Sequence, residues 1–239
     1  MPSPLVNPTQ QMNQFKEAAA QAAADQLRDG MIVGLGSGTT AALAVAAIGK
    51  RVKDGLRIIG IPTSEKTAAQ ARLLDIPLST LEETPAIDVT IDGADEIETS
   101  TLNLSKGGGG NLLREKIVAF ASSRMIIVAD ESKLVVQLGS RAVAVEVIPF
   151  GWKTTAKRVE QIGAHPTLRV SAQGEAFLTD DGNYILDCAF GPIQSPATLQ
   201  GKLDSVVGVV EHGLFVGIAQ QVFLGGAGGV TVLNLGQTS

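Results

Sequence analysis

The chain is poor in the residue types that form disulfides, bind zinc or contact nucleic acid. Its 239 residues include one cysteine, Cys188, and two histidines, His165 and His212. A single cysteine excludes an intrachain disulfide and fits a cytosolic protein. We expect Cys188 to pack as a small hydrophobic residue, because no His–Cys arrangement accompanies it. The net charge of −5 argues against nucleic acid as the main partner, since phosphate backbones are bound by basic patches.

The sequence also lacks a long hydrophobic run and a recognisable leader. The first 14 residues, MPSPLVNPTQQMNQ, contain no charged segment followed by an apolar one, and they are not rich in Arg and Ser. We therefore expect no signal peptide, no transit peptide and no membrane contact, and we expect the protein to work in the cytoplasm.

Small aliphatic residues and glycine are abundant instead. Hydrophobic residues make up 44% of the chain and aromatic residues only 4%, while 27 residues are glycine. This composition is typical of a sheet covered by helices. The length fits one large domain, or one domain with a smaller insert.

The first part of the chain alternates between short apolar runs and helical patterns. Strands are expected at 31–35, 56–61, 86–91 and 124–129, and helices at 12–28, 41–48, 64–74 and 111–122. Four such alternations predict an α/β fold with a Rossmann-like parallel sheet flanked by helices.

The pattern changes after about residue 138. Residues 142–148 alternate like a half-exposed strand, 154–162 and 198–203 are helical, and 181–183 form a turn between strands at 176–178 and 184–187. A further strand is expected at 167–170. This predicts a smaller α+β second domain over 139–212. Apolar strands at 221–224 and 230–233 predict that the first domain comprises residues 1–138 and 213–239.

A glycine-rich segment, GLGSGTT, spans residues 34–40 between a strand and a helix. A helix start offers free amides and the positive end of its dipole to a phosphate, and Ser37, Thr39 and Thr40 add hydroxyl donors. An ordinary strand–helix turn with a hydroxyl cap is the alternative. A dinucleotide site is disfavoured, because Thr39 replaces the third glycine of the fingerprint and the next strand ends without an acidic residue.

Two carboxylates, Asp92 and Asp95, follow the third predicted strand. Ligands of open α/β sheets bind beyond the carboxyl ends of the strands, so this loop is expected at the site. Asp92 and Asp95 could bind sugar hydroxyls or pass protons between oxygens. An Asp–Gly turn with a helix cap is the structural alternative, and an oxygen-only magnesium site also stays open.

The segment from Lys106 to Lys116 combines a cation, four glycines and a carboxylate. Glycines allow a ligand to approach the backbone closely. The helix that follows is apolar nearly all round, so we expect Glu115 to be buried, with a pKa raised towards that of a useful base. Alternatively, Glu115 is favoured by the helix dipole or pairs with Arg114 or Lys116. Lys133, after the fourth strand, could reach an anion at the same edge.

These segments, taken in order, resemble type A ribose-5-phosphate isomerase. The matching stretches are GLGSGTTA (34–41), TIDGADEI (90–97), KGGGGNLLREK (106–116), ADESK (129–133) and VEVIP (145–149). The likeness continues through DGNYILD (181–187) to the C-terminus. It implies interconversion of D-ribose 5-phosphate and D-ribulose 5-phosphate through a cis-enediolate, by a homodimer that needs neither a metal nor an organic cofactor.

The resemblance also implies roles for individual residues. Glu115 would be the base, Lys106 and the amides of the glycines after it would stabilise the enediolate, and Asp92 or Asp95 would assist proton transfer between oxygens. The residues implied to bind substrate are Ser37, Gly38, Thr39 and Thr40 at the phosphate, Asp92, Gly93, Ala94, Asp95, Lys106, Gly107, Gly108 and Gly109 along the sugar, and Lys133. The phosphate loop reads SGTT where the family often has TGST or SGST, and Gly110 stands where many members have alanine.

Three other functions are alternatives to isomerisation. One is a sensor domain without catalysis, but the stretch before Met31 is too short and too poor in basic residues for a DNA-binding helix-turn-helix. The second is another enzyme of related architecture, which acts on sugar phosphates or transfers acyl groups. A nicotinamide oxidoreductase is the third, and the glycine-rich segment disfavours it.

Overall fold

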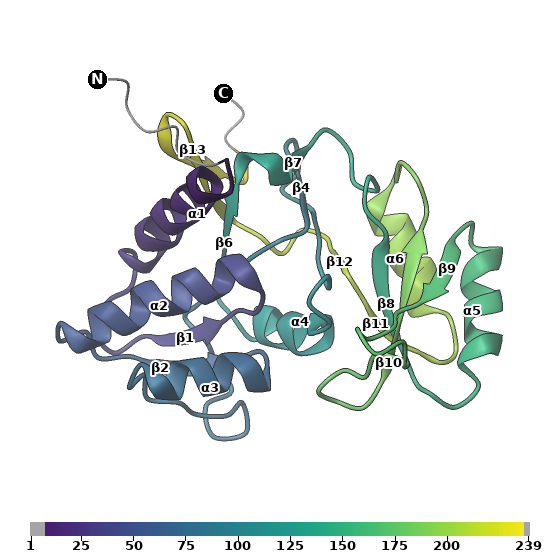
Figure 1. Cartoon of the computed structure of the whole chain (residues 1–239), viewed down its shortest axis with the longest axis horizontal. Helices are drawn as coiled ribbons and strands as arrows, with labels where there is room; N and C mark the ends of the chain where they lie inside the picture. The colour runs from purple at the N-terminus through teal and green to yellow at the C-terminus, as the bar shows by residue number, and fades with distance from the viewer. Residues whose placement is uncertain (1–7, 237–239) are drawn as a thin grey trace.

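A six-stranded sheet forms the larger part of the computed structural model, which describes residues 8–236 (Figure 1). Its strands lie in the order β14, β13, β6, β3, β1, β2. They are parallel, except that β14 runs antiparallel to β13. The strands are β1 (Ile32–Leu35), β2 (Ile59–Pro62), β3 (Val89–Asp92), β6 (Met125–Asp130), β13 (Gln221–Gly226) and β14 (Gly229–Asn234). The predicted parallel α/β fold is confirmed, and the C-terminal strands return to this sheet as expected.

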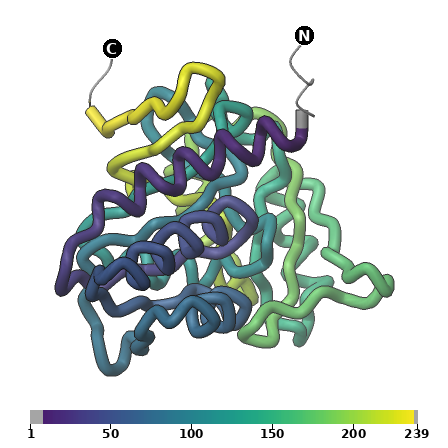
Figure 2. The backbone as a smooth tube through the Cα atoms, turned by 60° about the vertical axis from the view of Figure 1, so that its left-hand side comes forward, coloured from purple at the N-terminus to yellow at the C-terminus, as the bar shows by residue number. Residues whose placement is uncertain are grey.

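Helices cover both faces of this sheet. The helices are α1 (Pro8–Ala24), α2 (Thr39–Lys53), α3 (Glu65–Leu73) and α4 (Leu112–Phe120). Figure 2 shows α1 and α2 side by side on one face, where their alanines pack with α3 against alternate residues of the strands. The residues of β6 and β13 that point to the other face of the sheet pack against Ala119 of α4. Alternate strand residues therefore enter two separate cores.

The expectation that α4 is apolar and buried nearly all round was wrong. Ile117 is 48% exposed and Phe120 is 69% exposed. Only the stripe formed by Leu112, Glu115, Val118 and Ala119, with Lys116 beside it, is buried. The helix has one face on the protein and one in water, which is the usual arrangement for a helix that flanks a sheet.

A second sheet is antiparallel and lies beside the first (Figure 1). Its order is β11 (Val209–His212), β8 (Val143–Val147), β10 (Tyr184–Ala189), β9 (His165–Leu168). Helices α5 (Trp152–Gln161) and α6 (Pro196–Asp204) contribute to its core. These elements fall within residues 143–212. The proposed domain boundaries at 138 and 213 stay a prediction.

Two expectations for this sheet were wrong. Strand β8 is buried along its whole length rather than half-exposed, because Ala144 on its second face packs against Leu112 of α4. Residues 176–178 do not form a strand, since only a single bridge joins Ala176 to Val170.

A third, very small sheet links the other two. It consists of β12 (Leu214–Phe215), β5 (Leu104–Ser105), β4 (Glu96–Glu98) and β7 (Leu134–Val135), and β7 follows a 3-10 turn, η1 (Glu131–Lys133). The buried Glu96 side chain ties this sheet together by accepting hydrogen bonds from Ser105, Ser140 and nearby backbone amides. Strands of two or three residues carry no periodicity, so the sequence did not predict them.

The topology creates a crevice at one edge of the main sheet. From β1 the chain moves outward to β2, and β3 then lies on the opposite side of β1. Such a switch point opens a crevice at the carboxyl ends of the strands, where α/β proteins bind ligands. The segments that follow β1, β3 and β6 all begin at this edge.

None of the helices described within residues 8–236 is long and apolar enough to cross a membrane. The prediction that the chain starts without a leader rests partly on residues 1–7, which lie outside the described part.

Candidate active site

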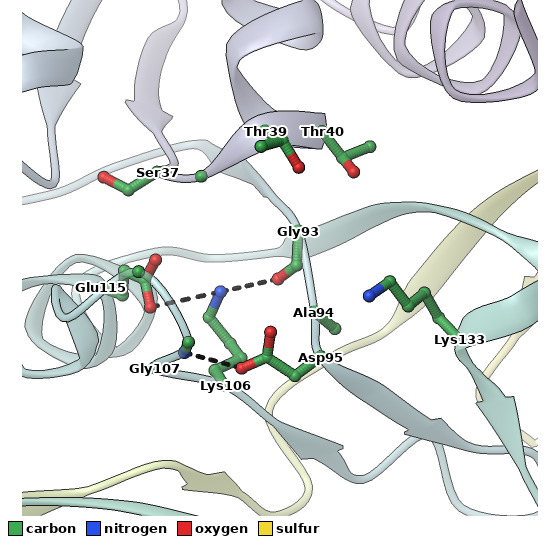
Figure 3. A pocket seen from close by; sticks show the side chains of 13 residues that line it. Ser37, Thr39, Thr40, Gly93, Ala94, Asp95, Lys106, Gly107, Glu115 and Lys133 are labelled. Carbon is green, nitrogen blue, oxygen red and sulfur yellow. Dashed lines mark hydrogen bonds and ion pairs between the residues drawn. The ribbon is translucent and has the colours of Figure 1, made fainter. Parts of the chain in front are cut away.

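A cavity with about 450 Å³ of empty space, partly open to solvent, lies at the carboxyl edge of the main sheet (Figure 3). Segments far apart in the sequence meet around it: the loop before α2, the loop after β3, the glycine segment, α4 and η1. Its lining residues are Ser37, Gly38, Thr39, Thr40, Gly93, Ala94, Asp95, Lys106, Gly107, Gly108, Gly109, Glu115 and Lys133. All of the candidate residues except Asp92 line this one cavity.

The Lys106 ammonium lies at the centre of the site. Its Nζ is 2.9 Å from Asp92 Oδ2 and 3.3 Å from Glu115 Oε2, and it donates a hydrogen bond of 2.6 Å to the Gly93 carbonyl. Figure 3 shows this side chain directed between Gly93 and Glu115. The Phe215 ring lies below, with its centroid 5.5 Å from the same nitrogen. Lys106 therefore joins the β3 loop to α4.

The backbone holds Lys106 in this position. Its amide donates to the Gly213 carbonyl at 2.8 Å, which continues the pairing of β5 with β12. A side chain at Gly213 would meet the Lys106 carbonyl oxygen at 2.1 Å, so only glycine permits this close approach.

Asp92 is fully buried behind the cavity instead of lining it. Its Oδ1 accepts hydrogen bonds from the amides of Ser37 (3.1 Å) and Gly93 (2.7 Å). Its second oxygen faces Lys106. Burial raises the pKa of Asp92, while Lys106 and the two amides oppose this rise. The Asp92 carboxylate thus holds Lys106 and the loop before α2, which begins at Ser37, in fixed positions relative to each other.

Glu115 is only 5% exposed, and its partner is Lys106. Its sequence neighbours are engaged elsewhere: Arg114 pairs with Asp181, and Lys116 pairs with Glu211 at 2.6 Å. The alternative of a Glu115 paired with Arg114 or Lys116 was therefore wrong, and the expected burial is confirmed. Burial raises the pKa of Glu115 to about 8, and Asp92 adds to this rise while the Lys106 cation opposes it.

The charges of this cluster do not cancel when all groups are ionised. Asp92 and Glu115 would carry two negative charges against the single positive charge of Lys106, whose own pKa is raised by these carboxylates despite its burial. This excess of negative charge favours the retention of one proton by the pair of carboxyl groups near neutral pH, in line with the raised pKa of Glu115. Glu115 is the better place for that proton, because Asp92 accepts two amide hydrogen bonds that favour its ionised form.

The loop before α2 offers two different sets of hydroxyl groups. The Ser37 hydroxyl contacts Thr63 (2.7 Å), Ser64 (2.8 Å) and Thr67 (3.1 Å) in a buried cluster. It points away from Thr39 and Thr40 in Figure 3. The hydroxyls of Thr39 and Thr40 have no hydrogen-bond partner among residues 8–236, and both line the cavity. They begin α2, whose first amides also lack helical acceptors.

Asp95, the glycine segment and Lys133 form the remaining walls. Asp95 Oδ2 accepts a hydrogen bond of 2.8 Å from the Gly108 amide. Lys133 extends from η1 towards the cavity (Figure 3), and burial lowers its pKa, as does the nearby Arg141. Two cations and two carboxylates thus line one cavity that is partly open to solvent.

Several residues that shape the site were not predicted from the sequence. Thr63 and Thr67 anchor Ser37, Phe215 supports Lys106, and Arg169 contacts the glycine segment. All four come from segments outside the motifs, and their residue types are ordinary for a core or a surface. Cys188 is buried as expected, which raises the pKa of its thiol to about 12.

One group of side chains outside the cavity has the spacing of metal ligands. Asp204, Glu211 and His212 each offer an atom within 4.8 Å of the others. The Lys116 ammonium already lies 2.6 Å from Glu211 and 3.4 Å from Nδ1 of His212. Because the Lys116 ammonium already supplies the positive charge that a metal ion would bring, we interpret this group as an ion-pair network between α4 and β11. Burial lowers the pKa of His212 to about 4.

Fold and cavity together define an α/β protein whose cavity has cations and hydroxyl donors suited to a small anionic molecule, beside a buried carboxylate. Comparison with known proteins narrows this class to one family. The sequence profile of "Ribose 5-phosphate isomerase A (phosphoriboisomerase A)" matches residues 59–229. A ribose-5-phosphate isomerase A of Synechococcus is 56% identical over 224 residues, which cover 93% of this chain and 97% of that protein.

Solved structures agree with the sequence comparison. Ribose 5-phosphate isomerase from Plasmodium falciparum superposes with a TM-score of 0.90 at 40% identity, covering 95% of this chain and 100% of that one. A D-ribose-5-phosphate isomerase in complex with phospho-erythronic acid has a TM-score of 0.90 at 36% identity, covering 93% of this chain and 99% of the other. The chain belongs to the ribose 5-phosphate isomerase A family.

The raised pKa of Glu115 predicts a pH-dependent stability. The folded protein keeps a proton that the unfolded carboxyl group loses above its ordinary value of 4.5. This contribution is complete below that value and is lost as the pH rises through about 8. Between these limits Glu115 should lower the free energy of unfolding by about 1.4 kcal/mol per pH unit.

Urea unfolding at several pH values, with Glu115→Gln and the exposed control Glu160→Gln, measures this term. Glutamine is neutral at every pH, so Glu115→Gln should gain stability over the parent from pH 5 to pH 9, whereas Glu160→Gln should follow the parent. A parent and a Glu115→Gln variant with parallel pH curves would contradict the buried, proton-holding state of Glu115.

Proposed function

We propose that this chain interconverts D-ribose 5-phosphate and D-ribulose 5-phosphate, with Glu115 as the base that moves the carbon-bound proton. The observation that carries the proposal is the position of the Glu115 carboxylate, buried against Lys106 in the same cavity that the start of α2 enters. Membership of the family supports the reaction, and the geometry supports the assignment of roles.

The start of α2 would bind the phosphate. The free hydroxyls of Thr39 and Thr40 and the amides of the first turn are donors suited to a dianion, and the helix dipole favours negative charge there. Lys133 adds a cation to the lining of the same cavity. Holding the phosphate at one end fixes the carbonyl end of the sugar against Glu115, so that binding energy is used for orientation.

The isomerisation needs one proton to move between adjacent carbons. In its ionised form, Glu115 would take the proton from C2 of the aldose and return it to C1 of the resulting cis-enediolate. The two carbons are neighbours on the same face of a planar intermediate, so one carboxylate reaches both. Lys106, held beside Glu115, supplies a fixed positive charge as the substrate oxygens become negative.

Asp95 is the better candidate for proton transfer between the sugar oxygens. It lines the cavity and is held by the Gly108 amide. Asp92 is fully buried behind Lys106, so we assign it to positioning that lysine. No step in this scheme requires a metal or an organic cofactor.

Glu115→Gln is expected to abolish most of the turnover, because glutamine cannot accept the proton, while binding of ribose 5-phosphate is largely kept. In the parent, kcat/KM should rise with pH towards about 8, since the carboxyl group must lose its proton before it can act. Product formation is measured by an assay for ribulose 5-phosphate and binding by calorimetry.

Glu160→Gln, on the exposed face of α5, is the matched control and should keep the parent's activity. Near-normal turnover in Glu115→Gln would remove Glu115 as the base. A parent that binds ribose 5-phosphate without ever producing ribulose 5-phosphate would instead be a sensor.

The phosphate assignment predicts a defect confined to phosphorylated substrates. Thr39→Val keeps the shape of the side chain but removes a hydroxyl donor that would contact the phosphate. KM for ribose 5-phosphate should rise roughly threefold to tenfold, the value of one hydrogen bond, while activity on unphosphorylated ribose should not change. Thr154→Val, in the exposed first turn of α5, is the control. An equal loss with both sugars would contradict the assignment.

We further propose that the protein acts in the cytoplasm as a homodimer. Apolar side chains are exposed in the turns next to the second sheet: Phe150, before α5, is 90% exposed, and Val207, before β11, is 85% exposed. Their segments adjoin, because the Ile148 amide donates to the Gly208 carbonyl. Exposed apolar patches of this kind commonly mark a contact surface.

Sedimentation should show a dimer for the parent and a weaker dimer for Phe150→Ser, and cell fractionation should recover the protein with cytoplasmic enzymes. A monomer at micromolar concentration would contradict the assembly.

A further inference from the structure

Arg169, in the smaller sheet region, contacts the backbone of the glycine segment from outside the cavity. It follows β9 and does not line the cavity. Its Nη1 donates to the carbonyls of Gly107 at 2.8 Å and Gly108 at 3.3 Å. Neither the sequence motifs nor the roles assigned so far account for this residue.

The rest of the guanidinium group is fixed in place. Its Nε and Nη2 form a forked pair with the Asp187 carboxylate of β10. Its carbon atom lies 5.9 Å from the centre of the Phe177 ring, and Phe177 in turn packs against Gly110. A planar fork held by a carboxylate is a rigid support, because little side-chain freedom remains to be lost.

Because peptide bonds are planar, a carbonyl held by Arg169 also fixes the direction of the N–H group in the same peptide. In a trans peptide the C=O and N–H groups point in opposite directions. Because the Gly107 carbonyl faces Arg169, the Gly108 N–H must face the cavity, and it does so by donating to Asp95. Likewise, the Gly108 carbonyl turned to Arg169 leaves the Gly109 N–H turned to the cavity.

The Gly109 N–H has no acceptor among the residues that the structure describes, and Gly109 lines the cavity. A backbone amide that is oriented but unpaired at the wall of a cavity is a donor available to a ligand oxygen. Glycine alone would leave these peptides free to rotate, since it has no Cβ to restrict them. The orientation of this donor therefore depends on Arg169.

We propose that Arg169 is a positioning residue, which holds the glycine segment so that the Gly109 N–H serves as an oxyanion donor to the enediolate. This rests on the proposed function. A donor aimed at developing charge acts mainly on the transition state, so its loss should lower kcat more than it raises KM. The phosphate end, bound at α2, should be unaffected.

The test compares Arg169→Gln and Arg169→Lys with the exposed control Arg158→Gln on α5. We expect Arg169→Gln to lower kcat roughly 10- to 100-fold, with little change in KM for ribose 5-phosphate. Affinity for phospho-erythronic acid, whose carboxylate presents two oxygens in one plane, should fall by a comparable factor. Arg169→Lys should recover part of the loss, and Arg158→Gln should match the parent.

A second variant and a spectroscopic readout separate positioning from folding. Asp187→Asn keeps the arginine but weakens the fork, so it should lower kcat in the same direction by a smaller factor. In amide NMR spectra, phospho-erythronic acid should shift the Gly109 resonance of the parent and not that of Arg169→Gln. An active parent whose Arg169→Gln variant keeps kcat, analogue affinity and the Gly109 shift would overturn the inference. So would equal changes in kcat and KM that follow thermal stability alone.

A parent without isomerase activity would reject the proposed function instead. The Gly109 shift would then still report whether Arg169 orients the amide.

Discussion

The site depends on one buried cation, the ammonium of Lys106. Without it, Asp92 and Glu115 would be buried carboxyl groups with no positive charge beside them, an arrangement that proteins avoid because of its desolvation cost. With it, Asp92 can be ionised and tied to the loop before α2, while Glu115 remains a carboxyl group of raised pKa facing the cavity. The three groups thus connect β3, β5 and α4 and set the protonation state of the base.

The smaller sheet contributes to this site although its residues do not line the cavity. The carbonyl of Gly213, which follows β11, accepts a hydrogen bond from the Lys106 amide. The Lys116 ammonium, on the residue after Glu115, donates to Glu211 and to the His212 carbonyl. Phe215, in β12 of the third sheet, lies beneath both lysines, with its ring centre 5.5 Å from the Lys106 ammonium and 5.0 Å from the Lys116 ammonium. Arg169 acts on the glycine segment from a third direction. The reacting groups thus lie on loops of the main sheet, on the glycine segment and on α4, and the second and third sheets brace them.

Much of the fold and most of the candidate site could be predicted from the sequence, because both leave local signals. The alternation around β1, β2, β3 and β6 has the periods of strand and helix, and the glycines at 107–110 indicate close backbone approach. The short strands β4, β5, β7 and β12 leave no such signal. The burial of Asp92 behind Lys106, and the turning of the Ser37 hydroxyl away from Thr39 and Thr40 into a buried cluster, depend on partners such as Thr63 that are brought near only by folding.

The central claim is that Glu115 moves a carbon-bound proton through an enediolate. Isomerisation in heavy water, followed by NMR of the sugar carbons, tests it most directly. A carboxylate that holds the proton exchanges some of it with solvent, so deuterium should appear at C1 of ribulose 5-phosphate made by the parent. Isomerisation at a normal rate with no deuterium at that carbon is the pattern of direct hydride transfer and would contradict the account.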